Sequence, residues 1–327
     1  MSNTPPTPET ARFLEVNDNS WIIHHLIVTR YQSKPSQPCW PDGEGALFSI
    51  DDAPTPTPPT RPPSHVCPIS DAGNNFPASL TWKIGLAHLR IDFNNLGTSE
   101  HVTLEALAKR SLGFQIPQVY YHKYLGKSYS IVFSDLPGNP LIKAWPTANQ
   151  AARTRWTQQI AEAYHELSKW RGDRICAVDG GNLQCFWLSS TTPSVPGSYN
   201  PEVLRANCEE MGLDCSELVF AHNYMMPLSF TVDEVQGLVG ICRWEMAGFL
   251  PKDWIRTMTR ANSFTQSWQA VKSSWSESDI NDFGDKIESA LKDKGFKEFW
   301  LNNCRWREEK RRRQEQEEAN RLQPPTV

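Results

Sequence analysis

Apolar residues recur at helical spacing most clearly between residues 148 and 171. They follow one another at steps of three or four residues, which places them on one face of a helix. The pattern predicts an amphipathic helix whose apolar stripe consists of Trp156, Ile160, Ala163, Tyr164, Leu167 and Trp170. Shorter helices are predicted over residues 99–111 and 201–212, and residues 252–320 are expected to be mainly helical.

Strand-like runs dominate the first half of the chain. SLTWKI at 79–84 and SYSIVF at 128–133 are short, rich in β-branched or aromatic residues, and fit strands. Residues 20–32 fit a strand or a short helix equally well. Further short strands are predicted at 119–121, 218–222, 229–232 and 238–242. This order predicts an α+β chain with two lobes, a small β-rich N-lobe and a larger helical C-lobe.

Two proline-rich stretches interrupt the pattern. The N-terminus is rich in Pro and Thr and is expected to be disordered over residues 1–19. Residues 34–64 contain PTPTPPTRPP, which cannot form an interior strand or helix because proline lacks the amide donor. We interpret residues 34–64 as a surface insertion, either a linker or a lid, in an N-lobe that spans 20–135. The C-lobe is expected over 136–304 and a charged helix or tail over 305–327.

Charge and cysteine usage narrow the class of protein. The formal net charge is −4, which gives no electrostatic reason to bind nucleic acid. No apolar run reaches the roughly 20 residues that a membrane span needs, and the polar start does not fit a signal peptide. The 8 cysteines form no Cys-x-x-Cys pair and have no histidines at zinc spacing. A cytoplasmic protein with free thiols and no bound metal is expected.

Several segments in a fixed order resemble the aminoglycoside phosphotransferase and choline kinase family, in particular its fungal members. They are WKIG at 82–85, LEAL at 104–107, IPQVYYH at 116–122, SIVFSDLPGNPL at 130–141, ICAVDGGNL at 175–183 and WEMAGFLP at 244–251. The resemblance implies a protein-kinase-like fold. It also implies that Lys83 lies on the third strand and touches nucleotide phosphates, with Glu105 as its helix partner.

The catalytic segment departs from the family pattern. Working members carry His-Gly-Asp-Leu-x-x-x-Asn and then, after a strand, Ile-Asp-Trp or Ile-Asp-Phe. The first Asp serves the attacking hydroxyl, and the Asn and the last Asp hold magnesium. In this chain His222 matches the motif His, but Tyr224, Ser229 and Arg243 replace the Asp, the Asn and the metal-binding Asp. Tyrosine is a poor base at neutral pH, Ser229 is at best a weak metal ligand, and Arg243 puts a permanent cation where a dication belongs.

The sequence leaves three functions open. In the first, the fold is reused, without a cofactor, to bind or transform a small molecule in secondary metabolism. Tyr224 would then be a proton donor, His222 a proton shuttle and Arg243 an anion clamp for cyclisation, isomerisation or elimination. In the second, the chain is an ATP- and magnesium-dependent kinase with displaced ligands. In the third, it is a non-catalytic scaffold. The ligand is expected in the cleft between the lobes, and the proline-rich insertion or the C-terminal helix could meet a protein partner.

Overall fold

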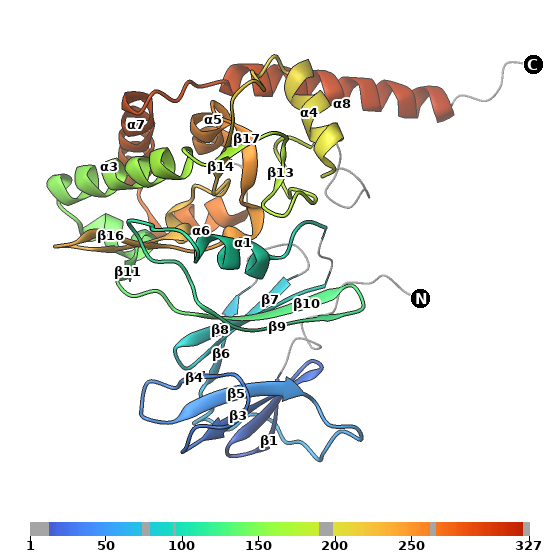
Figure 1. The fold of residues 1–327 in the computed structure, drawn as a ribbon, viewed down its shortest axis with the longest axis vertical. Coiled ribbons are helices and arrows are strands. Elements are labelled where there is room, and N and C mark those ends of the chain that lie inside the picture. The colour runs from blue at the N-terminus through green and yellow to red at the C-terminus, as the bar shows by residue number, and fades with distance from the viewer. Residues whose placement is uncertain (1–12, 74–78, 94–95, 190–198, 262–265, 323–327) are drawn as a thin grey trace, which may run out of the picture. The chain divides into compact units, whose positions relative to one another are not determined.

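The computed structural model describes residues 13–73, 79–93, 96–189, 199–261 and 266–322. It divides into two compact units (Figure 1). The first combines Met1–Asn95 with Pro117–Asp135, and the second combines Leu96–Ile116 with Leu136–Val327. The first unit is built from strands and the second is mainly helical. The prediction of an α+β chain with a β-rich N-terminal part and a helical C-terminal part is therefore confirmed.

The first unit contains two antiparallel five-stranded sheets, with strand orders β1-β2-β3-β5-β4 and β6-β7-β8-β10-β9. The strands of the first sheet are β1 (Leu14–Asn17), β2 (Ser20–Ile23), β3 (Leu26–Tyr31), β4 (Cys39–Pro41) and β5 (Leu47–Asp52). Those of the second are β6 (Ile69–Gly73), β7 (Ser79–Ile84), β8 (Ala87–Asp92), β9 (Val119–Leu125) and β10 (Ser128–Ser134).

The two sheets share one apolar core. Trp21, Trp40 and Phe48 of the first sheet belong to the same buried cluster as Trp82 and Leu89 of the second. The indole Nε1 of Trp40 also donates a hydrogen bond to the carbonyl of Ile84 at 2.8 Å. Because the two sheets bury their apolar faces in this shared core, their large aromatic side chains are removed from water. The buried indole of Trp40 keeps a hydrogen-bond acceptor.

The structure corrects two expectations about the N-terminal region. Strand β1 lies inside the stretch expected to be disordered, while residues 1–12 of that stretch lie outside the described residues. Strand β5 lies inside the expected proline-rich insertion and is an interior strand of its sheet, between β3 and β4. It carries no proline, whereas Pro41 ends the edge strand β4 and the dense prolines follow at 54–63. The proline argument therefore holds for 54–63 and not for the whole stretch.

The second unit contains eight α-helices among its described residues and two small sheets, ordered β11-β15-β16 and β12-β14-β17-β13. The helices are α1 (Glu100–Leu107), α2 (Leu141–Ala144), α3 (Gln150–Leu167), α4 (Pro201–Glu210), α5 (Trp254–Ala261), α6 (Gln266–Ser274), α7 (Glu277–Asp293) and α8 (Trp300–Leu322). The strands are β11 (Asn139–Pro140), β12 (Arg171–Gly172), β13 (Cys176–Ala177), β14 (Leu218–Ala221), β15 (Phe230–Asp233), β16 (Gly237–Ile241) and β17 (Gly248–Pro251). Three 3₁₀ turns complete the described part of this unit: η1 (Trp145–Thr147), η2 (Pro227–Ser229) and η3 (Trp244–Met246). Helix α1, expected in the N-lobe, thus belongs to the second unit.

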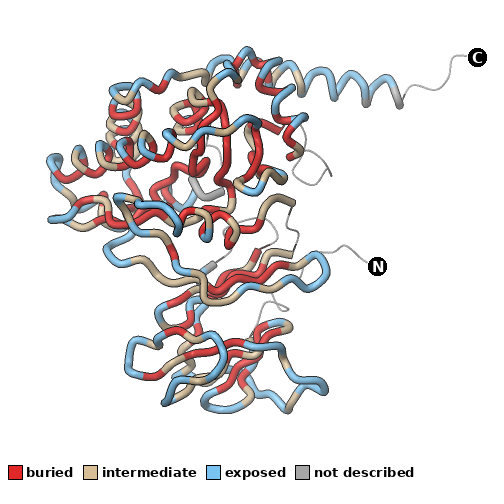
Figure 2. Tube along the Cα trace, viewed as in Figure 1, coloured by how far each residue is buried: buried red, intermediate tan, exposed pale blue. Residues whose placement is uncertain are grey.

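Helix α3 is the helix that the apolar stripe predicts. Asn149 caps its N-terminus by accepting a hydrogen bond from the amide of Ala152, and Trp156, Ile160 and Tyr164 are buried. Strands β14 and β17 are buried along their whole length, so the helices of this unit enclose a dry centre (Figure 2). The candidate catalytic segment begins directly where β14 ends.

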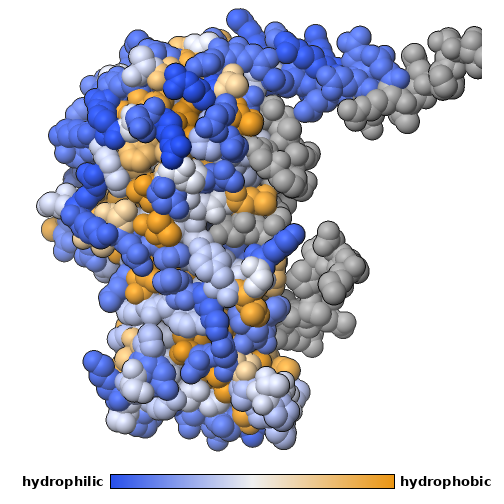
Figure 3. Space-filling view, turned by 45° about the vertical axis from the view of Figure 1, so that its right-hand side comes forward, coloured by the Kyte–Doolittle hydropathy of each residue, from blue (hydrophilic) through white to orange (hydrophobic). Residues whose placement is uncertain are grey.

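Helix α8 carries the charged C-terminal sequence. Near its start the buried Trp306 donates a hydrogen bond to Glu210 at 3.0 Å, which fixes α8 to α4. Further along, Arg311 pairs with Glu308 and Glu315 at helical spacing, and the surface of the helix is hydrophilic (Figure 3). Among the described residues, no helix combines the length and the apolar character needed to cross a bilayer.

Candidate functional site

The candidate site is built by two stretches of the second unit that are separated in the sequence by β15 and β16 and lie side by side. The first is the loop that follows β14, from His222 to the turn η2. The second is Cys242 and Arg243, between β16 and η3. The amide of Cys242 donates a hydrogen bond to the carbonyl of Ser229 at 2.9 Å, and this contact joins the two stretches.

His222 is fully buried, and both of its ring nitrogens are in hydrogen bonds. Nδ1 lies 3.0 Å from the hydroxyl of Tyr164 on α3, and Nε2 lies 2.8 Å from the carbonyl of Cys242. A carbonyl can only accept, so Nε2 carries the proton and Nδ1 accepts from the Tyr164 hydroxyl. Burial lowers the pKa of His222 to about 4, although the hydrogen bond to the Cys242 carbonyl raises this pKa in part. The imidazole is therefore neutral at pH 7, and it ties α3 to both stretches of the site.

Asn223 follows His222 and aligns with the glycine of the motif that the sequence resembles. Its φ of 59° is in the left-handed region, which asparagine tolerates better than most residues. The side-chain oxygen accepts a hydrogen bond from the indole of Trp254 at 3.0 Å, so the residue also anchors α5. The same backbone conformation that glycine would supply is thus reached with a side chain that adds a buried hydrogen bond.

Tyr224 and Ser229, which the sequence resemblance aligns with the catalytic Asp and the metal-binding Asn, are both buried. The hydroxyl of Ser229 donates to the carbonyl of Tyr224 at 2.9 Å and closes the turn between them. The Met226 amide bonds the same carbonyl at 2.9 Å. This carbonyl is therefore held by two donors, which fixes the backbone that carries the tyrosine ring.

Arg243, which the sequence resemblance aligns with the metal-binding Asp of the family motif, has a left-handed backbone, with φ 69° and ψ 59°. Its guanidinium carbon lies 5.8 Å from the centroid of the Tyr224 ring, within the range of a cation–π interaction. The side chain is partly exposed. A left-handed backbone costs an arginine of order 1–3 kcal/mol, so the surrounding contacts must enforce it.

One of those contacts comes from Glu100 in the first turn of α1. Its carboxylate accepts a hydrogen bond at 2.7 Å from the amide of Trp244, directly after Arg243, and the residue is 2% exposed. The Trp244 ring packs against His222 with centroids 4.6 Å apart and near-perpendicular planes. Glu100 therefore caps η3 in the way an N-cap side chain caps a helix, although it comes from a distant segment.

Replacing Glu100 with alanine should lower the free energy of unfolding by about 1–3 kcal/mol, because the buried amide of Trp244 loses its acceptor. Glu100→Gln keeps an acceptor oxygen of the same reach and should lose less. Urea unfolding of both variants measures the difference. Equal losses in the two variants would show that the carboxylate does not support this turn through the Trp244 amide.

The resemblance implies that Lys83 and Glu105 form a nucleotide-binding pair, but the two residues belong to different units. Lys83 lies on β7, the second strand of its sheet in chain order, and not on the third. The third strand, β8, instead carries Arg90, which is 5% exposed and has its Nε 3.2 Å from the carboxylate of Asp92. Glu105 lies exposed on α1 of the second unit. Lys83 is thus on the second strand of this sheet, and its contact with nucleotide phosphates stays a prediction.

In the first unit, Lys83 contacts Asp135. Its Nζ lies 2.9 Å from one carboxylate oxygen, while Nδ1 of His88 lies 2.8 Å from the other. Lys83 and His88 are directly opposite each other on β7 and β8, so one carboxylate bridges both. Burial alone would raise the pKa of Asp135, but the hydrogen bonds from His88 and Lys83 outweigh it and lower this pKa.

Sequence reasoning missed Tyr164, Cys242, Glu100 and Asp135. Tyr164 shares the helical spacing of the apolar stripe, so its hydroxyl looked like the polar tip of a core residue. Cys242 contributes through its backbone carbonyl, for which no side-chain pattern exists. Glu100 was readable only as a first-turn acid of a helix. Asp135 lies in the SDLPG segment, one of the segments that carry the resemblance. Its carboxylate was a possible partner for Lys83 on the predicted strand.

Comparison with known proteins gives similar solved structures at low sequence identity. No family model matches the sequence, and no curated protein matches it. The complex of streptomycin, ATP and APH(2″)-IIa has a TM-score of 0.45 at 11% identity and covers 74% of this chain and 84% of that chain. The GDP complex of aminoglycoside 2′-phosphotransferase-IIIa has a TM-score of 0.42 at 15% identity, covering 75% and 93%. APH(3″)-Id from Streptomyces rimosus has 0.40 at 13%, covering 73% and 92%. All three are aminoglycoside phosphotransferases, the family that the sequence motifs resemble.

Proposed function

We propose that this chain is a kinase-like protein that does not transfer phosphoryl groups and that binds or transforms an anionic or oxygen-rich small molecule. Tyr224 and Arg243 are the groups proposed to contact that molecule. The observation that carries the proposal is the placement of the Arg243 guanidinium over the Tyr224 ring, 5.8 Å from its centroid. These two residues replace the catalytic Asp and a metal-binding Asp of the family motif.

The residues present do not fit a magnesium ion. Between His222 and Ser229 the sequence contains no carboxylate, and the Ser229 hydroxyl is used inside the turn. A dication placed about 4 Å from a guanidinium would be repelled by roughly 8 kcal/mol at an effective dielectric constant of about 20. Magnesium takes oxygen ligands, mostly carboxylates and waters. The side chain proposed for the metal-binding position is a cation, and the nearby Glu100 carboxylate already accepts from the Trp244 amide. No step of the proposed chemistry therefore uses a metal or ATP.

A fixed cation beside a phenol suits a different kind of reaction. Arg243 can pair with a carboxylate, phosphate or enolate through its planar fork, and Tyr224 can donate its phenolic proton to a developing negative charge. Cyclisation, isomerisation and elimination on an oxygenated substrate also release a proton from the substrate. The Tyr224 phenolate, formed when Tyr224 protonates the substrate oxygen, is the group proposed to accept that proton, and this returns the phenol. A tailoring step in secondary metabolism, which the resemblance to fungal members suggests, is one setting for such chemistry.

His222 is assigned a positioning role in this proposal, in place of the proton shuttle expected from the sequence. A shuttle must exchange protons near neutral pH, whereas the pKa of His222 is lowered to about 4 by burial. Its two nitrogens hold Tyr164 and the Cys242 carbonyl, directly before Arg243. The residue therefore stabilises the conformation that presents the guanidinium.

Calorimetric titration with ATP, with and without magnesium, tests the proposal. We expect magnesium not to strengthen nucleotide binding and no turnover of ATP. Arg243→Asp should introduce magnesium dependence, because aspartate supplies a carboxylate and tolerates a left-handed backbone. Arg243→Lys is the matched control, since it keeps the cation and should behave as the wild type does. Tight Mg·ATP binding with ATP turnover in the wild type would establish instead a kinase with displaced ligands.

A further inference from the structure

The tight turn of the first hairpin consists of two histidines. His24 and His25 connect β2 to β3, and His24 has a φ of 58° whereas His25 is not left-handed. One left-handed residue at the first central position is the pattern of a type II′ turn, where glycine is the preferred residue. A β-hairpin therefore uses a strained histidine at a position where glycine would fit without strain. Strain of this kind is found where side chains are held for a purpose.

The two imidazoles converge at this turn. Their Nδ1 atoms lie 2.9 Å apart, and the ring planes are nearly perpendicular at 88°. Nε2 of His25 lies 3.5 Å from the hydroxyl of Ser130 on β10. With its proton on Nε2 toward Ser130, His25 directs the lone pair of Nδ1 at the Nδ1 of His24. The ring of His24 is supported on another side by Phe93, with centroids 5.3 Å apart.

The separation of the nitrogens defines the geometry that an ion would meet. Imidazole nitrogens bind first-row divalent ions at about 2.0–2.1 Å. Two nitrogens 2.9 Å apart, each at that distance, subtend an angle of about 90° at the ion. An angle near 90° joins neighbouring positions of a square-planar or octahedral ion, whereas tetrahedral zinc needs about 109°.

We propose that His24 and His25 form a binding site for Ni²⁺ or Cu²⁺, with water in the remaining positions. Both ions favour imidazole in tetragonal geometry. On binding, the Nδ1 proton that His24 shares with His25 moves to its own Nε2, so two neutral imidazoles ligate and no net proton is released.

Asp52 lies near enough to His25 to offset part of the charge of an ion. Leu26 pairs with Asp52 across β3 and β5, and the amide of Ala53 donates to the carbonyl of His25 at 2.9 Å. The carboxylate of Asp52 pairs with Lys123, and the two side chains are 56% and 37% exposed. Because an ion pair this exposed contributes little, a dication can draw the carboxylate away.

Calorimetric titration of the full-length chain with NiCl₂ and with ZnCl₂, at pH 7.5 in the presence of a phosphine reductant, tests the site. One equivalent of Ni²⁺ should bind, more tightly than Zn²⁺, and Ni²⁺ should raise the melting temperature. His24→Gly and His25→Gln should each weaken Ni²⁺ binding by a factor of about 100 or more. His24→Gly should also raise the melting temperature of the metal-free protein, because glycine adopts the turn without strain.

The His24→Gly variant separates loss of a metal ligand from loss of folding. If it is more stable than the wild type and no longer binds Ni²⁺, it has lost only the site. His65→Ala, which removes another, exposed histidine of the first unit, is the matched control and should bind as the wild type does. Unchanged Ni²⁺ affinity in His24→Gly, an equal loss in this control, or tighter binding of Zn²⁺ than of Ni²⁺ would overturn the proposal.

Discussion

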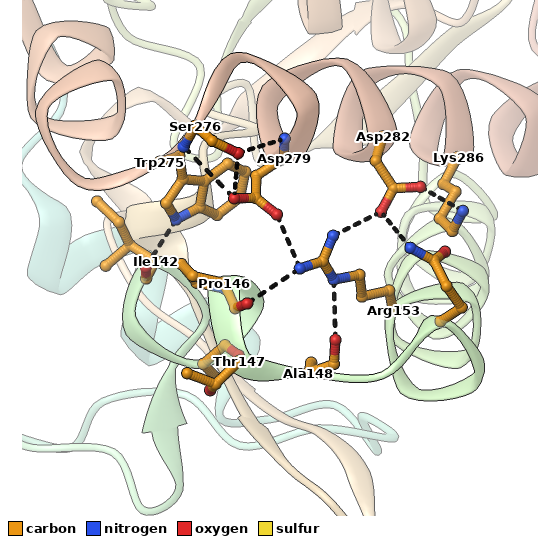
Figure 4. A network of polar contacts seen from close by, with 12 residues as sticks. Ile142, Pro146, Thr147, Ala148, Arg153, Trp275, Ser276, Asp279, Asp282 and Lys286 are labelled. Atoms are coloured by element: carbon orange, nitrogen blue, oxygen red, sulfur yellow. Dashed lines mark hydrogen bonds and ion pairs between the residues drawn. The ribbon is translucent and has the colours of Figure 1, made fainter.

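Replacing Arg153 with alanine should lower the free energy of unfolding by about 3–5 kcal/mol, the loss expected when one partner of a buried ion pair is removed. Arg153 on α3 is 8% exposed, and its guanidinium reaches two carboxylates of α7, Asp279 at 2.7 Å and Asp282 at 3.0 Å (Figure 4). It also donates to the carbonyls of Pro146 and Ala148. The substitution would leave Asp279 with its hydrogen bonds to Ser276 but no cation, and Asp282 with Lys286 as its remaining cation.

The surroundings of this network explain why the loss should be large. Asp279 completes a capping box with Ser276 at the start of α7, and the indole of Trp275 donates to the Ile142 carbonyl at 2.7 Å (Figure 4). The guanidinium carbon of Arg153 lies over the Trp145 ring, 5.2 Å from the ring centroid. One side chain therefore connects α3, the 145–148 turn and α7, and its loss affects all three.

Chemical denaturation of Arg153→Ala beside Arg205→Ala measures this effect. Arg205 pairs with Glu209 within α4, with side chains 48% and 56% exposed, so its loss should cost below about 1 kcal/mol. Similar losses at the two positions would mean that the network of Figure 4 contributes no more than an exposed pair.

Lowering the pH from 7 to 4 should cost the protein about 3 kcal/mol through His222 alone. The folded-state pKa is about 4 because of burial, against about 6.5 for an unfolded histidine. Between these values the unfolded chain binds a proton that the folded chain does not, so stability falls as the pH falls. The cost begins near pH 6.5 and is nearly complete at pH 4.

His222→Gln isolates this contribution. Glutamine keeps a donor for the Cys242 carbonyl but cannot take up a proton, so the variant should be less stable than the wild type at pH 7 and lose about 3 kcal/mol less between pH 7 and pH 4. Urea unfolding at several pH values gives the two profiles. His65→Gln, at an exposed position, should keep the wild-type profile. Parallel profiles for wild type and His222→Gln would mean that the buried imidazole does not carry the pH dependence.

The local elements were predictable where the chain is strongly periodic. The stripe from Trp156 to Trp170 predicted α3, which spans Gln150–Leu167, and the strand at 79–84 matches β7. Strands β1 and β5 were missed because their neighbourhoods are rich in proline and polar residues. Strand β1 is held by pairing with β2, and β5 by pairing with β3. Such pairing between separate segments is not visible in a local stretch of sequence.

The candidate site divides in the same way. The order and spacing of the motifs predict His222, Tyr224, Ser229 and Arg243 as site positions, and their roles stay predictions. Their partners were decided by tertiary structure: Tyr164 reaches His222 from α3, and Glu100 reaches Trp244 from α1. Lys83 lies on the second strand of its sheet and not on the third, because strand count depends on which segments pair into the sheet.

By itself, then, the sequence determined residue chemistry: a cation and a phenol in the segment that resembles the family motif, and an apolar period of 3.6 where α3 forms. Only the folded chain decided which groups meet. Hydrogen bonds and ion pairs between segments 58 to 144 residues apart, such as Tyr164 with His222 and Glu100 with Trp244, depend on the packing of whole elements. Burial, and with it the lowered pKa of His222, follows from that packing and from no local pattern.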